Sequence, residues 1–333
     1  MLPQSLRTAT AKIIVAMSGG VDSSVSAALL KRAGFNISGV FMNLYDLPRF
    51  REAEKRAKRV AKVLKIPLRV LDLRKEFKKE VIDYFLAEYR AGCTPNPCVV
   101  CNKKIKFNFG GWMASGHYVR RVGSELLQAK DKEKDQSYFL WQLTQKQLKH
   151  ILFPNGHYTK PEVRKLAKEF KLPVFEVPES QEVCFVQKTT EQFLSHHIKR
   201  KPGSIIDIKG EVLGQHQGLP FYTIGQRKGI GLAGGPFWVL DKDLKKNLLI
   251  VTKKEKDLLR KELTFKNVNW ISGKAPKLPL KVKAKIRYRS ALSPATVYRN
   301  KVIFNRPQRA ITPGQSVVFY RGEELLGGGV IRT

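Results

Sequence analysis

Acidic residues are scarce in this chain of 333 residues, in which 28 Asp and Glu stand against 62 Lys and Arg and leave a formal net charge of +34. The basic residues are spread over the whole length, so the excess is not confined to a basic tail. Such a surface attracts polyanions regardless of their sequence, and nucleic acid is the partner it first suggests. A compositional bias without any partner is the alternative.

Cysteine and long apolar segments are also scarce. Four cysteines in a chain of this length exclude a disulfide-rich scaffold and leave thiol chemistry or metal binding. No apolar run approaches the ~20 residues that a membrane-spanning helix needs, and the N-terminal residues lack the apolar core of a secretory signal. We therefore expect a cytoplasmic protein of two or three domains that has no membrane partner.

The most informative stretch is residues 13–24, which read IIVAMSGGVDSS. The apolar start predicts a short buried parallel strand, the glycines predict a turn, and residues 25–32 predict a helix. Two glycines let backbone N–H groups converge where the helix N-terminus adds positive potential, so the stretch predicts an anion site rather than an empty turn. Asp22 is placed to help hold a hydrated Mg²⁺. No lysine follows the glycines, which excludes a Walker loop.

Alternating patterns predict an α/β domain with a parallel sheet. Strands are expected at residues 37–42 and 68–73, and helices at 51–64 and 76–91. Ligands bind such sheets at the carboxyl ends of the strands, where Met42 would contact an adenine or simply pack in the core.

Short strands are predicted for the rest of the chain. Residues 201–256 are rich in glycine, and residues 263–333 alternate like antiparallel strands. In KVKAKIRYR, residues 281–289, five cations fall on one face of a strand. That face would follow phosphates on a small β-barrel, or it is an ordinary solvated face.

Two cysteines are candidates for chemistry. Cys101 is expected at a helix N-terminus capped by Asn102, beside Lys103 and Lys104, and both features lower a thiol pKa. Cys184 lies in a separate segment, SQEVCFV. The alternative for each is an inert buried thiol.

The motifs resemble those of one enzyme family. SGGVDSS is similar to the pyrophosphate loop of PP-loop ATPases, and TPNPxxxCNxxIKF, SGHY, KDQSYFLW, SQEVCFV and GQHQGLPFYTIGQRKGIG follow in the order found in tRNA-specific 2-thiouridylases. The resemblance covers essentially the whole chain. It implies a PP-loop catalytic domain over residues 1–199, a small β-rich central domain over 200–258 and a tRNA-binding C-terminal β-barrel over 259–333.

The resemblance also implies the reaction and its participants. ATP with Mg²⁺ would adenylate the C2 oxygen of a wobble uridine in tRNA, and sulfur would replace that oxygen, with release of AMP and pyrophosphate. Cys184 would carry a persulfide supplied by a cysteine desulfurase or a sulfur-relay protein, while Cys101 would assist and could close a disulfide with it. Asp22 is the third predicted catalytic residue. Implied ATP contacts are Ala16, Met17, Ser18, Gly19, Gly20, Val21, Asp22, Ser23, Met42 and Gly116. Implied contacts with the base or tRNA are Asn96, Pro97, Cys98, His117, Lys134, Asp135, Gln136, Arg287, Tyr288 and Gln315.

The chain departs from the family pattern at its cysteines. Cys98 stands where TPNPD has aspartate, and Cys93 replaces a common arginine. Cys98, Cys101 and Cys184 could therefore hold a [4Fe–4S] cluster with one open iron. A zinc site that uses all four cysteines, or dithiol chemistry with Cys98 as a spare, remains open.

The chain is also short in two places. Only residues 108–112 separate the IKF helix from the strand before SGHY, and an acidic turn is missing after Met42. Because parallel crossovers need about a dozen residues, we expect either a single clipped helix or a locally rearranged sheet. A PP-loop ligase or amidase acting on a small molecule, and a catalytically impaired tRNA-binding relative, are the rival functions.

Overall fold

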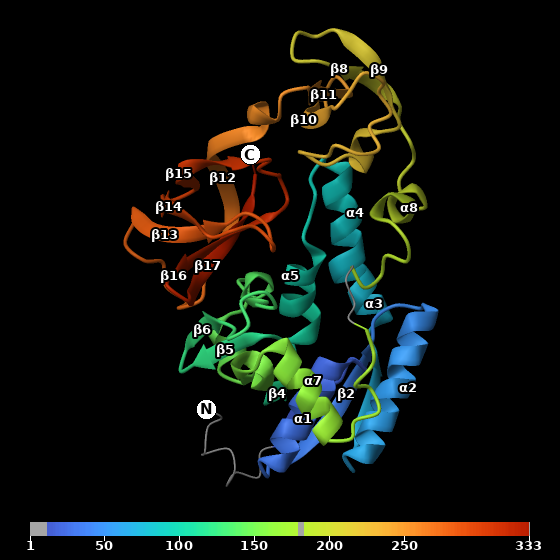
Figure 1. Ribbon diagram of the computed structural model, residues 1–333, viewed down its shortest axis with the longest axis vertical. Helices are drawn as coiled ribbons and strands as arrows, with labels where there is room; N and C mark the ends of the chain where they lie inside the picture. The colour runs from blue at the N-terminus through green and yellow to red at the C-terminus, as the bar shows by residue number, and fades with distance from the viewer. Residues whose placement is uncertain (1–11, 179–182, 333) are drawn as a thin grey trace.

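The computed structural model describes residues 12–178 and 183–332. Its N-terminal part is built on a fully parallel five-stranded sheet of order β3-β2-β1-β4-β7, drawn in blue and green in the lower half of Figure 1. The α/β prediction is confirmed. The strands are β1 (Ile13–Ala16), β2 (Ile37–Asn43), β3 (Leu68–Asp72), β4 (Met113–Ala114) and β7 (Ile151–Leu152).

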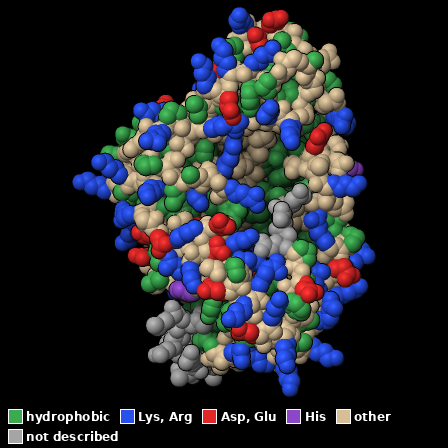
Figure 2. All heavy atoms as spheres, viewed as in Figure 1, with side chains coloured by type: hydrophobic (Ala, Val, Ile, Leu, Met, Phe, Trp, Pro, Cys, Tyr) green, Lys and Arg blue, Asp and Glu red, His purple; other side chains and the backbone are tan. Residues whose placement is uncertain are grey.

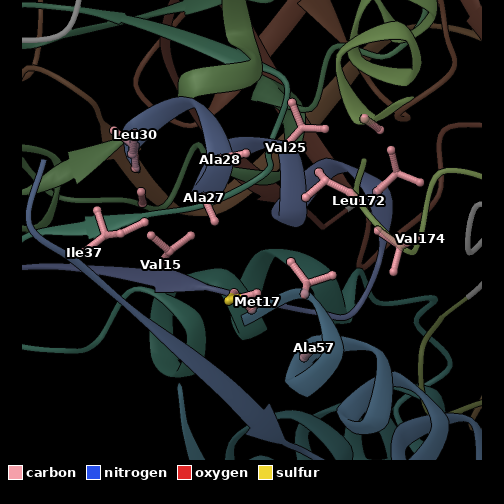
Figure 3. Packing of buried hydrophobic residues seen from close by; sticks show 14 of the residues in the cluster. Val15, Met17, Val25, Ala27, Ala28, Leu30, Ile37, Ala57, Leu172 and Val174 are labelled. Atoms are coloured by element: carbon pink, nitrogen blue, oxygen red, sulfur yellow. The ribbon is translucent and has the colours of Figure 1, made fainter. Parts of the chain in front are cut away.

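Helices cover this sheet, and their apolar faces form its core. Val25, Ala28 and Leu30 of the first helix pack against Val15 and other strand residues, as Figure 3 shows. That helix begins at Val21 rather than at residue 25, so Asp22 and both following serines belong to its first turn. The helices are α1 (Val21–Arg32), α2 (Pro48–Val63), α3 (Arg74–Phe77), η2 (Lys78–Ile82), α4 (Asp83–Arg90), α5 (Pro97–Cys101), η3 (Asn102–Lys106), η4 (Ser137–Phe139), α6 (Gln145–Leu148), η5 (Pro154–His157), α7 (Lys160–Glu169) and α8 (Thr190–Ser195).

The connection between β3 and β4 is not the single clipped helix that was expected. The chain passes from β3 at one edge to β4 on the far side of β1, and residues 73–112 make this connection with five helical segments, α3 to η3. The prediction was wrong because it assigned the whole crossover to the helix beside the strand.

A four-stranded sheet of order β10-β11-β8-β9 forms the part at the top of Figure 1. It packs Ile205, Val239 and Val251 into a small core of its own. Its elements are β8 (Gly203–Ile206), β9 (Val212–His216), η6 (Leu219–Phe221), β10 (Trp238–Asp243), β11 (Leu248–Thr252) and η7 (Glu255–Leu258).

The C-terminal strands close into a six-stranded antiparallel barrel, because β12 pairs with both β15 and β17. Val302, Phe304, Val317 and Phe319 fill its interior. The strands are β12 (Leu259–Trp270), β13 (Leu280–Lys285), β14 (Ser293–Val297), β15 (Lys301–Arg309), β16 (Ser316–Arg321) and β17 (Glu324–Ile331).

A hairpin from the N-terminal part extends the barrel sheet. Strands β5 (Val119–Val122) and β6 (Glu125–Gln128) pair with each other, and β6 pairs with β17 at Leu126 and Leu325. Glu323 in the β16–β17 turn also forms ion pairs with Arg120 and Lys132. The N-terminal part of the chain and the barrel therefore share one sheet. No helix among the described residues has both the length and the apolarity to span a membrane.

Candidate active site

The glycine turn lies at the carboxyl end of β1. Gly19 has a φ of +73°, and a Cβ atom there would come within 2.1 Å of the Ala53 carbonyl oxygen. Gly20 is the N-cap of α1 and provides no capping side chain, so the first amides of the helix remain for a ligand. The Ser18 amide donates to Ser23 Oγ at 3.1 Å, which closes the turn. This is the geometry of an anion-binding helix N-terminus.

A second glycine and a buried asparagine hold the first turn of α1 from the other side. A Cβ on Gly116 would come within 2.6 Å of the Ser23 amide nitrogen, so only glycine lets this backbone approach. Asn155 Nδ2 donates to the Asp22 carbonyl at 2.9 Å and to the Gly116 carbonyl at 3.3 Å. Asn155 is fully buried and was missed from the sequence, where it carries no motif.

The Asp22 carboxylate is already engaged within the protein. Tyr118 donates its hydroxyl to Asp22 Oδ1 at 2.8 Å, and Lys160 Nζ lies 2.6 Å from the same oxygen. Lys160 begins α7 and is buried. The described residues contain no group of three His, Cys, Asp or Glu side chains arranged to hold a metal ion. Asp22 Oδ1 is therefore already paired with two protein groups, and we derive no step from a Mg²⁺ ion.

The other predicted nucleotide contacts surround this turn. Ala16 ends β1 and pairs with Val40, and Met17 is buried next to it with its sulfur beside Gly39. Met42 lies further along β2, near the carboxyl edge of the sheet, and is half-buried against a neighbouring apolar cluster. The positions predicted from Ala16 to Ser23, with Met42 and Gly116, thus lie at one edge of the sheet.

The cysteine helix differs from the prediction. Asn96, not Asn102, is the N-cap, and α5 runs from Pro97 to Cys101, so Cys101 ends the helix instead of starting it. Burial raises the pKa of the Cys101 thiol to about 12, whereas the opposite direction was expected. The cation that lowers the pKa of this thiol is Lys106, not Lys103 or Lys104, and Lys104 lies 3.6 Å from Glu80 on the surface.

The helix end and the distant cysteine meet in one apolar cluster. Cys101 is buried in it, and Cys184 packs against it beside Phe185. Burial raises the pKa of Cys184 to about 11 and also raises that of Cys98. The two thiols of Cys101 and Cys184 interact electrostatically, and Lys106 lowers the pKa of all three. The structure therefore brings the predicted pair together. Residues 180–182 of the SQEVCFV motif lie outside the described residues.

Cys98, Cys101 and Cys184 interact electrostatically with one another. Among the described residues, these thiols form no set of three metal ligands, and the cation of Lys106 interacts with each of Cys98, Cys101 and Cys184. Cys93 lies elsewhere, and its charged neighbours are Glu88, Lys266 and Lys242. We therefore identify none of the four as a metal ligand, and derive no step through an iron–sulfur cluster or zinc.

His117 lies beside Ser115, which follows β4, and beside Phe107, which follows η3. Its Nδ1 lies 2.9 Å from Ser115 Oγ, and its ring centroid lies 5.6 Å from that of Phe107. Burial and the nearby Lys106 lower its pKa to about 3, so the imidazole is neutral at physiological pH.

The three residues of the KDQ motif, Lys134 to Gln136, differ in burial. Asp135 is buried, and its carboxylate accepts hydrogen bonds from the amides of Ala129 and Ser137 and from the Ser137 hydroxyl at 2.7 Å. A direct contact of this carboxylate with tRNA would require its exposure. Gln136 exchanges hydrogen bonds with the backbone of Tyr118, and Lys134 is half-buried.

The predicted residues of the barrel have different partners, and Gln315 is the one that contacts the segment before α5. Gln315 Nε2 donates to the Thr94 carbonyl at 2.8 Å, just before Asn96 and Pro97. Arg287 was expected on the outward basic face, but β13 ends at Lys285 and the Arg287 guanidinium bonds Thr312 Oγ1 at 2.9 Å and the Ala310 carbonyl. Tyr288 packs on Phe139, with ring centroids 4.5 Å apart. Along β13 the expected row holds for Lys281 and Lys283, which are exposed, and for Lys285, which is half-buried, while the exposed Arg289 lies beyond the strand.

A hollow lies between these parts. Figure 2 shows it near the centre of the face, between the barrel and the region of α4, with Lys and Arg side chains around its rim. A groove bordered by cations suits an anionic polymer.

A strand, a glycine turn and a helix N-terminus at the carboxyl edge of a parallel sheet are typical of nucleotide-binding α/β folds. The family model described as tRNA methyl transferase HUP domain matches residues 11–188, its PRC-barrel domain matches 191–253, and an aminomethyltransferase beta-barrel domain matches 260–331. The chain belongs to the tRNA-specific 2-thiouridylase family, because relatives of that name are 44% and 47% identical to it over 96% of its length.

Known relatives match along almost the whole chain. The chain is 47% identical to tRNA-specific 2-thiouridylase MnmA of Moorella thermoacetica, over 96% of this chain and 99% of that protein. It is 44% identical to the enzyme of Carboxydothermus hydrogenoformans, over 96% and 97%. Among solved structures, the U34-tRNA thiolase NcsA from Methanococcus maripaludis with its [4Fe–4S] cluster is 20% identical, with a TM-score of 0.37 over 55% of this chain and 64% of that chain.

Proposed function

We propose that this protein is an ATP-dependent tRNA sulfurtransferase that converts the wobble uridine of its tRNA substrates to 2-thiouridine. The observation that carries the proposal is the meeting of Cys101 and Cys184 in one cluster, on the same fold that builds the anion-binding turn. Two thiols from separate segments in contact through one apolar cluster suit a relay of sulfur followed by disulfide formation. The family membership and the relatives' activity support the same reaction.

The first chemical step would activate a poor leaving group. The uridine O2 attacks the α-phosphorus of ATP, pyrophosphate leaves, and the N3 proton is lost to solvent. The α1 N-terminus and the turn at Ser18 to Gly20 would bind the phosphates. Ala16 to Ser23, Met42 and Gly116 are the proposed ATP contacts, and Asp22 would act by fixing the first turn of α1 through Tyr118 and Lys160.

Sulfur would then replace the activated oxygen. The terminal sulfur of a persulfide on Cys184 attacks C2, the C2–O bond breaks, and AMP carries the oxygen away. The Cys101 thiolate attacks Cys184 Sγ and breaks its bond to the transferred sulfur, which leaves 2-thiouridine and a Cys101–Cys184 disulfide. A thiol reductant restores the two cysteines. This sequence of steps corresponds to the dithiol alternative, in which Cys98 takes no part in the reaction.

The partners follow from this chemistry. A persulfide-bearing protein, either a cysteine desulfurase or a sulfur-relay protein, would load Cys184 in the cytoplasm. The tRNA would bind along the basic hollow, with its base near Asn96, Pro97, Cys98 and His117. Lys134, Gln136, Arg287, Tyr288 and Gln315 would line the approach. Residues 1–199, 200–258 and 259–333 would act as catalytic, central and tRNA-binding domains.

The test is nucleoside mass spectrometry of unmodified tRNA incubated with the protein, ATP, Mg²⁺ and a persulfide source. We expect ATP-dependent 2-thiouridine, with AMP formed in equal amount, and none from Cys184→Ser. Folded protein that binds tRNA yet forms no thiouridine would contradict the enzyme and favour the impaired tRNA-binding relative.

A further inference from the structure

The helix that carries Cys98 and Cys101 changes its winding directly after Cys101. Helix α5 continues into the π-helical turn η3, in which the Phe107 amide donates to the Asn102 carbonyl at 3.0 Å, five residues back. π-helical turns are rare and are often found at functional sites. This one therefore needs an explanation.

The wider turn decides which face Lys106 occupies. In an α-helix of about 3.6 residues per turn, a side chain five positions after Cys101 points well away from it. A π turn takes in roughly one more residue, so the fifth position returns to the side of the helix that carries Cys101. Cys98 lies one α-helical turn before Cys101 on that side. The π turn thus brings Cys98, Cys101 and Lys106 to one face.

A neighbouring segment holds the π turn in place. Gln147 of α6 donates from Nε2 to the carbonyls of Lys103 and Phe107, at 3.0 Å each. Asn102 Nδ2 donates to the Phe139 carbonyl at 3.1 Å. Gln147 thus binds backbone acceptors at both ends of the turn, and the Asn102 side chain binds an acceptor outside it, so tertiary contacts fix the position of the turn.

Lys106 faces thiols from two segments of the chain. The charged or titratable groups that act on its ammonium within the described residues are Cys98 and Cys101 from α5 and Cys184 from the segment before α8. His117, neutral and beyond β4, is close enough to be affected by it. Arg49 of α2 acts on Cys184 alone among these thiols, and its guanidinium bonds the Val186 carbonyl at 2.5 Å.

We propose that Lys106 is a positioning residue for sulfur transfer: the π turn places its ammonium on the cysteine face, where it stabilises the sulfur anions of Cys101 and Cys184. The part concerning a persulfide anion rests on the proposed function. The part concerning thiolates does not. Burial raises the pKa of each thiol, and Lys106 is the cation that opposes this rise in all three.

The test is site-resolved alkylation of the full-length protein by iodoacetamide, without ATP or tRNA, read by mass spectrometry across a pH series. Removing a nearby cation raises a thiol pKa by about one unit, which lowers the fraction of thiolate roughly tenfold below that pKa. We therefore expect Lys106→Met to slow alkylation of Cys101 and Cys184 about tenfold near neutral pH and to move both profiles to higher pH. Lys106→Arg, which keeps the charge, should restore most of the rate.

Two controls separate charge from general damage. Lys104→Met removes a cation from the surface of the same turn and should change neither profile. Arg49→Met should slow Cys184 only. Thermal unfolding checks each variant, and Lys106→Gln replaces Lys106→Met if the latter does not fold. Unchanged alkylation without Lys106, or equal slowing by Arg and Met, would overturn the inference. Because alkylation needs no substrate, its outcome is independent of thiouridine formation.

Discussion

The Tyr118 hydroxyl donates to Asp22 Oδ1 at 2.8 Å and so connects the hairpin region to the first turn of α1. Strand β5 begins at the next residue, and the β5–β6 hairpin belongs to the same sheet as the barrel. The anion-binding turn and the barrel are therefore linked through one side chain. Lys160 Nζ, 2.6 Å from the same oxygen, completes the contact.

This contact predicts coupled effects of Tyr118 and Lys160. Tyr118→Phe removes one hydrogen bond to a charged group and should reduce the free energy of unfolding by about 1–2 kcal/mol. Lys160→Met leaves the partly buried Asp22 carboxylate without its cation, and we expect a loss of about 1–3 kcal/mol. ATP affinity should fall in both, as measured by calorimetry and urea unfolding. Asp22→Asn combined with Lys160→Met should cost less than the sum of the two changes, and strict additivity would contradict the contact.

Gly19 should tolerate no side chain. Gly19→Ala combines a φ of +73° with a clash against the Ala53 carbonyl oxygen, so it should lower both stability and ATP affinity. Gly34 is a matched control, because it has a φ of +83° but open space around it. Gly34→Ala should cost only the backbone strain, about 1 kcal/mol. Equal urea midpoints for the two variants would show that the close approach at Gly19 is not required.

We expect Asp135, which is buried, and Lys134, which is half-buried, to have different functions. Asp135→Ala leaves buried donors without an acceptor, and we expect it to destabilise the protein by about 2–4 kcal/mol. Lys134→Met should leave the urea midpoint nearly unchanged while weakening tRNA binding and reducing its salt dependence. Filter binding over a salt series, with urea unfolding of both variants, separates the two. Weaker tRNA binding by a stable Asp135→Ala would restore a direct contact for Asp135.

The buried thiols should make stability fall at alkaline pH. Folding raises the pKa of Cys101 from 9.0 to about 12 and that of Cys184 from 9.0 to about 11. Their protonated forms are favoured in the folded state, so their contribution is complete below pH 9.0 and is lost as the pH rises toward these folded values. In urea unfolding across this range, Cys101→Ala should lose stability less steeply than the unmodified protein. Parallel curves would contradict the assignment.

The sequence predicted the sheet, the barrel and the anion turn because each depends on local pattern. Strict alternation in β13 and the glycine turn after β1 are local features, and the structure confirms them. The π turn at Asn102 to Lys106 could not be predicted, since it depends on Gln147 donating from a distant segment. The same holds for the pKa of the Cys101 thiol. The sequence predicted that Lys103 and Lys104 would lower it, whereas burial raises it and Lys106 is the cation that acts on it.

Long-range pairing also explains the missed residues. Asn155 and Lys160 carry no sequence signal, yet both contact Asp22 because η5 and the start of α7 lie against α1. Arg287 fits an outward basic row by spacing alone. The end of β13 at Lys285 turns it toward Thr312 instead.

In the proposed reaction the terminal sulfur on Cys184 enters the base, and Cys101 then releases the thiolated tRNA from Cys184. The direct measurement is a single turnover with protein whose Cys184 persulfide carries isotopically labelled sulfur, with unmodified tRNA and ATP and without added sulfur donor. We expect labelled 2-thiouridine, one AMP per thiouridine, and a Cys101–Cys184 disulfide in the same amount by peptide mass spectrometry. Cys101→Ser should instead retain the tRNA on Cys184. Unlabelled thiouridine, or labelled product without the disulfide, would contradict the proposed reaction.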